Sequence, residues 1–289
     1  MTDMQYVAPS TLDEAVGAFA TGGDAARILA GGTDLLVQMR AGMVRPGLIV
    51  DIKNVDEMTR VDRTDDGGFY VGAAVSGAVL AEHAEFGKAW PGVLEALNLI
   101  GSTQVQGRAS LGGNLCNGSP AGDSVPALVA AGAVASLQGP NGRRDLPVEA
   151  MPAGPGRTNL TKGEIVVGFT FPKRLPHSSD AYLRMIPRTE MDIAVVGVGV
   201  NLTLDGDKCV AARVGLGAVA PTVLLVDAAA QALIGSNLDE AALDKAAQAC
   251  TDAANPIDDK RGTVAYRKKV SGVLLKRTAA IAIARAKSA

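Results

Sequence analysis

One fourteen-residue segment, residues 110–123, constrains the fold of this chain more than any other. Its sequence, SLGGNLCNGSPAGD, contains four glycines, two asparagines, two serines and one acid. Ordering such a flexible segment is costly in conformational entropy, while its side chains can donate and accept hydrogen bonds at short range. A purely structural loop is one interpretation, because Asn, Gly and Ser favour turns. A loop that holds a ligand is the other.

A second glycine-rich loop, AGGTDLL at residues 30–36, lies much earlier in the chain. It follows an apolar run, residues 26–30, that predicts a buried strand. Paired glycines let the backbone turn tightly and expose consecutive N–H groups, which can bind anionic oxygens. Alone, such a motif is more often an ordinary turn. Two such loops, each beside apolar strands, together favour a large phosphorylated ligand.

Neither loop matches the better-known phosphate-binding motifs. The chain has no G-x-x-x-x-G-K-[ST], so a P-loop nucleoside triphosphatase is unsupported. Residues 197–201, GVGVN, resemble the beginning of a dinucleotide fingerprint but lack its third glycine and lie inside a predicted strand. Close backbone packing explains these glycines better.

Composition narrows the possible partners. The net charge is −2 and only 3% of residues are aromatic, which argues against a nucleic-acid partner or an anionic membrane surface. The three cysteines (Cys116, Cys209 and Cys250) are far apart and there are two histidines, so we expect no disulfide scaffold, zinc site or iron–sulfur cluster held by this chain. Cys116 is interpreted as a small loop side chain, because no neighbouring His or Lys would activate it.

No targeting segment is visible. The N-terminus lacks the basic and apolar regions of a secretory signal. The longest uncharged stretch, residues 124–142, is broken by Pro126 and Pro140, so we expect no membrane span. We expect a cytoplasmic protein.

Hydrophobic periodicity predicts α+β organisation. Ser10 is the expected cap of a first helix, and Ser76 of a helix that continues to about Phe86. The last third begins with two strand runs joined at Asp205 and continues with two Ala-rich helices. The predicted strands are residues 26–30, 48–52, 69–75, 133–137, 144–148, 164–171, 193–204 and 209–218, and the last two predicted helices are 240–253 and 264–287.

The chain resembles the FAD-binding medium subunit of the molybdenum hydroxylases, the group that includes carbon-monoxide dehydrogenase and bacterial xanthine dehydrogenase. The resemblance covers nearly the whole chain and its motifs occur in the family's order. They are AGGTDLL (30–36), SLGGNLCNGSPAGD (110–123), EIVVGFTFP (164–172), MDIAVVGVGV (191–200), RVGLGAVAPT (213–222) and VAYRKKVSGVLLKR (264–277).

The resemblance implies an α+β fold of two parts. The first is an FAD-binding domain of the vanillyl-alcohol-oxidase (PCMH) type, with one subdomain at residues 1–52 and another at residues 53–176. The second is a C-terminal α+β domain at residues 177–289, with an antiparallel sheet and helices. The predicted boundary between the two parts lies near residues 172–179.

The resemblance also implies which residues hold FAD. In the family the two loops bind the pyrophosphate and ribityl region, Asn117 and Asp123 match positions beside phosphate and ribose, and Val166 matches an aliphatic residue near the flavin ring. The loop residues are Ala30, Gly31, Gly32, Thr33, Asp34, Ser110, Leu111, Gly112, Gly113 and Asn114. For Val166 an ordinary core position is the favoured alternative.

Two positions depart from the family pattern. Gln106 and Gly107 stand where Arg-Asn is common, and Arg184 stands where the family usually has Lys near the flavin. A planar guanidinium does not replace a compact ammonium. A solvated surface charge is the equal alternative for Arg184.

By resemblance, this chain is an oxidoreductase subunit with no catalytic residue and no metal site of its own. It receives electrons from iron–sulfur clusters in a small subunit and passes them to an external acceptor. Substrate is oxidised at a molybdopterin cofactor in a large subunit, and the assembly is expected to be a dimer of heterotrimers. A self-sufficient flavoprotein oxidoreductase of the same fold and a non-enzymatic nucleotide-binding module are the alternatives. The substrate and the acceptor (NAD, quinone or oxygen) stay open.

Overall fold

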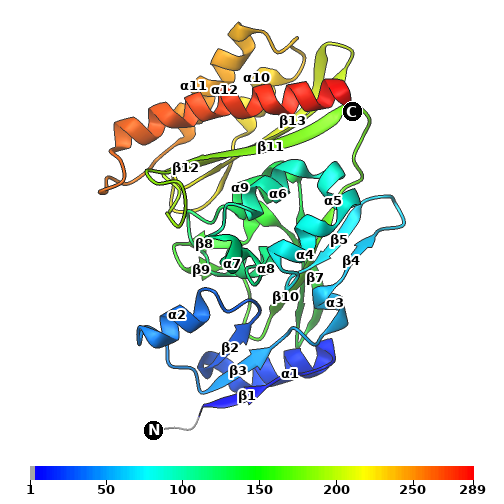
Figure 1. The fold of residues 1–289 in the computed structure, drawn as a ribbon, viewed down its shortest axis with the longest axis vertical. Coiled ribbons are helices and arrows are strands. Elements are labelled where there is room, and N and C mark those ends of the chain that lie inside the picture. Colours follow the sequence, from blue (N-terminus) through cyan, green and yellow to red (C-terminus); the bar gives the residue numbers. More distant parts are fainter. Residues whose placement is uncertain (1–3) are drawn as a thin grey trace.

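The fold is seen in a computed structural model, which describes residues 4–289. Figure 1 shows three layers stacked along the long axis, each built around one β-sheet. The N-terminal segment forms the layer at one end, and the C-terminal third forms the layer at the other. No helix of the described residues is long and apolar enough to cross a membrane.

The first layer is a three-stranded parallel sheet in the order β1-β3-β2. Helix α1 (Leu12–Gly22) joins the first two strands, and Thr11 caps it. Sequence analysis placed this cap at Ser10, which is wrong by one residue, because Thr11 and Glu14 form a reciprocal capping box. The strands are β1 (Gln5–Val7), β2 (Ala26–Leu29) and β3 (Leu48–Asp51), and a short 3₁₀ turn (Gly23–Ala25) precedes β2.

The middle layer is a five-stranded antiparallel sheet in the order β4-β5-β10-β6-β7. The predicted hairpin around Pro140 is confirmed as β6 and β7. A bulge between Val166 and Gly168 interrupts the register of β10 against β6. The strands are β4 (Val61–Arg63), β5 (Phe69–Gly72), β6 (Val134–Gly139), β7 (Gly142–Pro147) and β10 (Ile165–Phe171), and β8 (Pro152–Gly154) pairs with β9 (Arg157–Thr158) in a separate small sheet.

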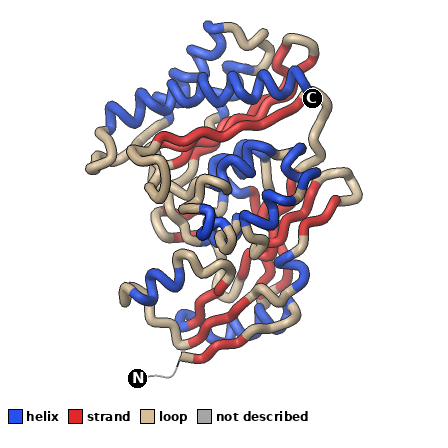
Figure 2. Tube along the Cα trace, in the orientation of Figure 1, coloured by secondary structure: helices blue, strands red, loops and turns tan. Residues whose placement is uncertain are grey.

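Short helices cover the middle sheet (Figure 2). Ser76 caps a helix as predicted, accepting a hydrogen bond from Val79 N at 3.3 Å. The single helix predicted up to Phe86 is two helices, because the extended backbone of His83 ends the first and its Nδ1 caps the second. The helices are α3 (Asp56–Thr59), α4 (Gly77–Glu82), α5 (Ala84–Ala89), α6 (Pro91–Leu97) and α7 (Thr103–Gln106), and a 3₁₀ turn (Val148–Ala150) follows β7.

The predicted loop at residues 110–123 is only partly a loop. Ser110 caps a helix, α8 (Leu111–Cys116), by accepting from Gly113 N at 3.1 Å. A further helix that sequence analysis did not predict, α9 (Ser124–Ala131), begins directly after the segment. All eight residues of α9 are buried, so it has no polar face and no amphipathic pattern to reveal it.

The C-terminal layer is a four-stranded antiparallel sheet in the order β11-β12-β13-β14, covered by helices (Figures 1 and 2). The predicted hairpin and both predicted C-terminal helices are confirmed, whereas β11 was not predicted. The elements are β11 (Ser178–Met185), β12 (Val196–Asp205), β13 (Lys208–Gly217), β14 (Leu224–Leu225), α10 (Asp227–Leu233), α11 (Glu240–Ala253) and α12 (Val264–Ser288).

Glycines in β12 and β13 let the buried helix α9 lie directly on the C-terminal sheet. A Cβ built at Gly199 or Gly215 would lie 2.6 or 2.3 Å from the carbonyl oxygen of Pro126, and one at Gly197 would lie 2.5 Å from the Tyr182 hydroxyl. Real Cβ atoms do not come so close, so only glycine fits these positions. The interpretation of the glycines at residues 197–201 as a site of close backbone packing is therefore confirmed at Gly199.

Candidate functional site

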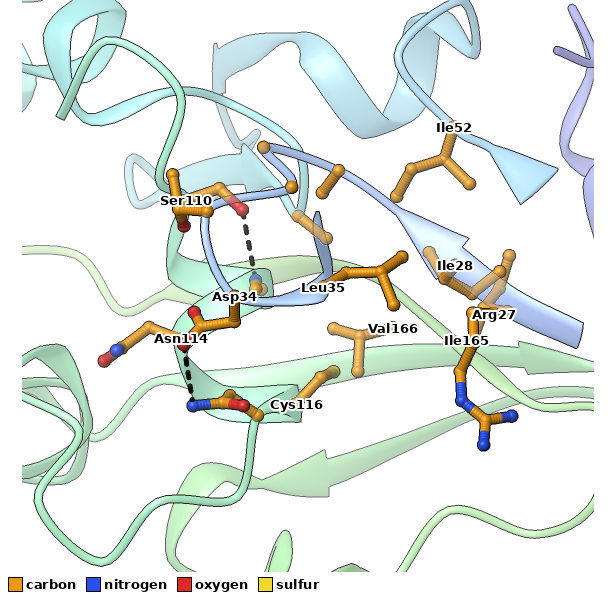
Figure 3. Close-up of a pocket in the computed structure, with 18 of the residues that line it drawn as sticks. Arg27, Ile28, Asp34, Leu35, Ile52, Ser110, Asn114, Cys116, Ile165 and Val166 are labelled. Atoms are coloured by element: carbon orange, nitrogen blue, oxygen red, sulfur yellow. Dashed lines mark hydrogen bonds between the residues drawn. The ribbon is translucent and has the colours of Figure 1, made fainter. Parts of the chain in front are cut away.

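A cavity of about 510 Å³ lies where the first layer meets the middle layer, and both glycine-rich loops form part of its wall. Figure 3 shows Asp34 and Leu35 of the first loop facing Asn114 and Cys116 of the second, with Val166 of β10 between them and Arg27 farther along. The volume is within the range of small-molecule sites. Two segments far apart in the sequence thus meet at one site.

Most of the predicted cofactor residues line this cavity, and three do not. Those that do are Ala30, Gly31, Gly32, Thr33, Asp34, Ser110, Gly112, Gly113, Asn114, Asn117 and Val166. Leu111 points into the hydrophobic core instead, with 1% exposure. Asp123 and Arg184 form an ion pair with each other outside the lining.

The first loop is folded against the backbone that leads into the second. A Cβ at Gly31 would lie 1.9 Å from the carbonyl oxygen of Arg108, and Gly32 has a positive φ of 75°. Both positions therefore require glycine for the shape of the loop itself. Side chains also join the loops, since Asn117 Nδ2 donates to Asp34 Oδ1 at 3.3 Å. Burial raises the pKa of Asp34 above its ordinary value.

The first loop leaves a row of backbone donors free. The N–H groups of Gly32, Thr33 and Asp34 donate to no other residue in the described range 4–289. Consecutive free N–H groups of this kind can bind the oxygens of a phosphate or pyrophosphate. This observation fits the phosphorylated ligand that the sequence predicts.

The second loop contributes an open position and a fixed amide. A Cβ at Gly113 would meet Ser110 Oγ at 3.2 Å and otherwise enter the cavity. Asn114 Oδ1 accepts from the backbone N and the hydroxyl of Ser124, at 3.1 and 2.7 Å. Its oxygen is thereby used by α9, and its amide NH₂ group is left for a ligand.

A lysine that sequence analysis missed supports the first loop from behind. Lys53 Nζ donates to the carbonyl oxygen of Ala30 at 3.1 Å and to both carboxylate oxygens of Asp51, at 2.6 and 2.7 Å. Tyr6 donates to the same carboxylate at 2.6 Å. Although burial opposes it, these bonds hold the pKa of Asp51 below its ordinary value. Lys53 belongs to no motif, because its contact with Ala30 depends on how β2 pairs with β3.

The far end of the cavity is largely apolar and was also missed. Arg27, beside it, donates to the backbone oxygens of Asp24 and Ala26, at 2.8 and 2.7 Å. Apolar walls suit an aromatic ring system. The apolar lining residues include Phe19, Ile28, Ile52, Ile100, Leu160 and Ile165. Their only signal in the sequence is that most lie in apolar runs.

The Asp123–Arg184 pair is buried between the middle and C-terminal layers. Arg184 Nη1 donates to Asp123 Oδ2 at 2.7 Å, and Tyr182 donates to Oδ1 at 3.2 Å. The Arg184 side chain is 4% exposed, so its interpretation as a solvated surface charge is wrong. Burial raises the pKa of Asp123 to about 6, against the opposing effect of Arg184. Within the described residues, Arg184 Nε has no partner.

Two further residues of the sequence analysis lie in the cavity wall. Val166 is 5% exposed, so it is a core residue that also lines the cavity. Cys116, the last residue of α8, is the only exposed cysteine and lines the cavity.

The fold and the site define a class of flavin-binding protein. Residues 2–174 match the family described as the FAD binding domain in molybdopterin dehydrogenase, and residues 181–282 match the CO dehydrogenase flavoprotein C-terminal domain. This chain belongs to that family of molybdopterin-dehydrogenase flavoproteins. The predicted fold class, a two-part FAD-binding fold followed by a C-terminal α+β domain, is confirmed.

Similar proteins match over their full length. The chain is 33% identical to the carbon monoxide dehydrogenase medium chain of Afipia carboxidovorans, covering 98% of each. It is 28% identical to a putative xanthine dehydrogenase FAD-binding subunit of Escherichia coli, covering 97% of this chain and 96% of that one.

Two solved structures also match this chain over nearly its full length. A chain of the Cu,Mo-CO dehydrogenase in its cyanide-inactivated form has a TM-score of 0.94 at 30% identity. A chain of quinoline 2-oxidoreductase from Pseudomonas putida has a TM-score of 0.89 at 27% identity. Each match covers 98% of both chains.

Proposed function

We propose that this chain holds FAD in the cavity between its first and middle layers and is the flavoprotein subunit of a heteromeric molybdenum hydroxylase. The observation that carries the proposal is that both glycine-rich loops, identified separately in the sequence, line one cavity. Family membership supports the identity of the cofactor.

Different groups of residues would hold the pyrophosphate and a ring of FAD. The free N–H groups of Gly32, Thr33 and Asp34 would bind the pyrophosphate, and the space beside Gly113 would let it approach the backbone. The apolar walls near Ile28 would enclose a ring. Bound FAD supplies the redox chemistry, while the chain contributes binding and orientation. We keep Leu111, Asp123 and Arg184 as proposed cofactor residues on the family resemblance, although none lines the cavity.

The proposed division of the chain follows the sequence prediction: FAD-binding subdomains at residues 1–52 and 53–176 and a C-terminal domain at residues 177–289. Two relatives are named medium chain and FAD-binding subunit, so subunits of this family work in multi-subunit complexes. We propose an iron–sulfur small subunit and a molybdopterin large subunit as partners, in a cytoplasmic dimer of heterotrimers that passes electrons to an external acceptor. A self-sufficient flavoprotein is not favoured, because those relatives match end to end.

The test is purification of the tagged chain expressed with its partner subunits. We expect a yellow complex that releases close to one FAD per chain and contains iron and molybdenum. A colourless chain that takes up no added FAD would overturn the proposal.

Cys116 offers a separate test of where FAD binds. In the chain stripped of flavin, a maleimide should react with Cys116 alone, because Cys116 is exposed in the cavity wall whereas Cys209 and Cys250 are buried. Added FAD should block the reaction. Equal labelling with and without FAD would place the cofactor elsewhere.

A further inference from the structure

The outer side of helix α2 (Leu35–Arg40) carries an exposed apolar surface beside the cavity. Leu36, Val37 and Met43 are 51%, 64% and 75% exposed, and no residue of α2 is buried. We call these three residues, together with Arg40 and Arg45, the α2 surface. Figure 1 shows α2 projecting from one edge of the molecule. Contiguous exposed apolar side chains with a polar rim are typical of interaction sites.

Helix α2 turns its other side toward the cavity. Leu35 and Gln38, three residues apart and so on one side of the helix, line the cavity, as does Val44 in the loop that follows. Leu36, Val37 and Arg40 lie on the remaining surface, where a helix packed only on its own domain would carry polar residues. An α-helix with its side chains is about 10 to 12 Å across, so a partner seated here would lie about that far from the cavity.

The charged side chains on α2 and in the loop after it are basic, whereas Asp34, directly before α2, lines the cavity and accepts a hydrogen bond from Asn117. Arg40, Arg45 and Arg108 form no ion pair or side-chain hydrogen bond with any described residue. The segments 35–50 and 99–118 contain these three arginines and no acidic residue. Arg108 belongs to the same region, since its backbone packs against Gly31 at the start of the first loop.

We infer that the α2 surface is the docking site for an acidic protein surface with an apolar centre, and that its occupant is the subunit that donates electrons to the cofactor. The inference rests on the proposed function. It adds the face of this chain that the electron-donating subunit contacts. A second copy of this chain fits poorly, because a two-fold interface would bring this basic surface against an identical basic surface. Met and Arg are also enriched in protein interfaces.

The experiment compares two exposed valines on short helices. Val37→Asp places a carboxylate in the centre of the α2 surface, and Val79→Asp places one on α4, where Val79 is 55% exposed. Each tagged variant is expressed with its partner subunits, and iron and FAD per chain are measured in the purified complex. We expect Val37→Asp to lose the iron while it retains FAD, and Val79→Asp to retain both.

A second pair of variants tests the charges without adding a carboxylate to the apolar centre. Replacing Arg40 and Arg45 together by Glu should weaken association with the iron-containing subunit about tenfold or more, and should reduce its dependence on salt. The matched control is Arg277→Glu on α12, another exposed arginine with no ion pair among the described residues.

The outcomes separate this inference from the proposed function. If the wild-type complex contains FAD and iron but Val37→Asp and the double arginine variant retain the iron, the docking site is wrong and the proposed function stands. Equal loss of iron from Val79→Asp also overturns the docking site. Self-association of the isolated wild-type chain through the α2 surface, abolished by Val37→Asp, would identify a second copy as the occupant instead. A wild-type complex without iron overturns both proposals.

Discussion

Single glycines in the two loops have different roles. Gly31 and Gly32 are required by the chain itself, one by contact with the Arg108 backbone and the other by its positive φ. Gly113 has an ordinary helical position and faces open cavity. Loss of FAD after substitution of Gly32 would therefore not distinguish a blocked site from a misfolded loop. Gly113 gives the cleaner test.

We predict that Gly113→Ala weakens FAD binding and leaves the fold intact. The added methyl group would occupy space that the pyrophosphate needs, and overpacking of about 1 to 3 kcal/mol corresponds to an increase of about 5-fold to 150-fold in the dissociation constant. Titration of the flavin-free chain with FAD measures the effect. Gly17→Ala is the control, because a Cβ there meets nothing within 4 Å. Equal affinity in both variants would show that the second loop does not approach the cofactor.

Asp123 predicts a pH-dependent part of the stability. Burial raises the pKa of its carboxyl group to about 6 in the folded chain, against an ordinary value of 3.8. The folded state therefore binds the proton more tightly, so this contribution is complete below pH 4 and is lost as the pH rises through 6. Two pKa units correspond to about 3 kcal/mol.

The measurement is urea unfolding of the wild type and of Asp123→Asn between pH 4 and pH 7. The free energy of unfolding of the wild type, relative to the variant, should fall by up to about 3 kcal/mol across this range. The variant removes this group's titration and keeps its size. A difference that stays constant, or one that grows with pH, would contradict the raised pKa.

Residues within motifs could be predicted from the sequence, and residues that act through tertiary contact could not. The two loops were found because clustered glycines mark segments whose backbone turns tightly and can approach a ligand. Lys53 and Arg27 carry no local signal, because the contact of Lys53 with the first loop and the place of Arg27 in the cavity wall both depend on how the parallel strands pair. The Asp123–Arg184 pair joins segments of different layers, so no single segment could reveal that it is buried.

Among the secondary-structure elements, α9 has the most demanding packing. It lies between the middle layer and the sheet of β12 and β13, where Gly199 and Gly215 face Pro126. The predicted strands could be recognised because their apolar runs are bounded by turn residues, whereas β11 and several short strands were missed. Helix α9 was not, because a helix buried on every side has no polar stripe.

We predict that Gly215→Ala destabilises the chain by about 1 to 3 kcal/mol, because its Cβ would overlap the backbone of α9. Denaturant unfolding of the variant beside Gly17→Ala measures this change. Under conditions in which the variant is fully folded, its affinity for FAD should stay close to that of the wild type, because Gly215 does not line the cavity. A variant as stable as the wild type would mean that the helix and the sheet separate at little cost.

At the scale of the whole molecule, arginines fasten the C-terminal layer to the middle layer. Arg213 of β13 donates to the carbonyl oxygen of Val129 at 3.0 Å and to Glu149 at 2.9 Å. Arg285 of α12 donates to the carbonyl oxygen of Asp180 at 3.0 Å and pairs with Glu95 of α6. These contacts, together with the packing of α9 against Gly199 and Gly215, join the middle and C-terminal layers.

The connection at residues 172–177 is fastened in the same way. Arg174 stacks 3.6 Å over the ring of Trp90 and donates to Asp180 and Asn201, each at 2.6 Å. Trp90 is the single tryptophan of the chain and is 1% exposed. Its fluorescence therefore reports on the middle layer at its junction with the C-terminal layer.

We predict that the chain unfolds in one cooperative transition and that FAD shifts the whole of it. Trp90 fluorescence should follow the middle layer, while far-ultraviolet circular dichroism follows the helices of all three layers, including α12 of the C-terminal layer. At a free FAD concentration of 100 times the dissociation constant, the free energy of unfolding obtained from each signal should rise by the same amount, about 2.7 kcal/mol. Because the cavity lies outside the C-terminal layer, independent layers would give two transitions, of which only the fluorescence transition responds to FAD. Coincident shifts therefore require that cofactor binding in the first two layers stabilises the third.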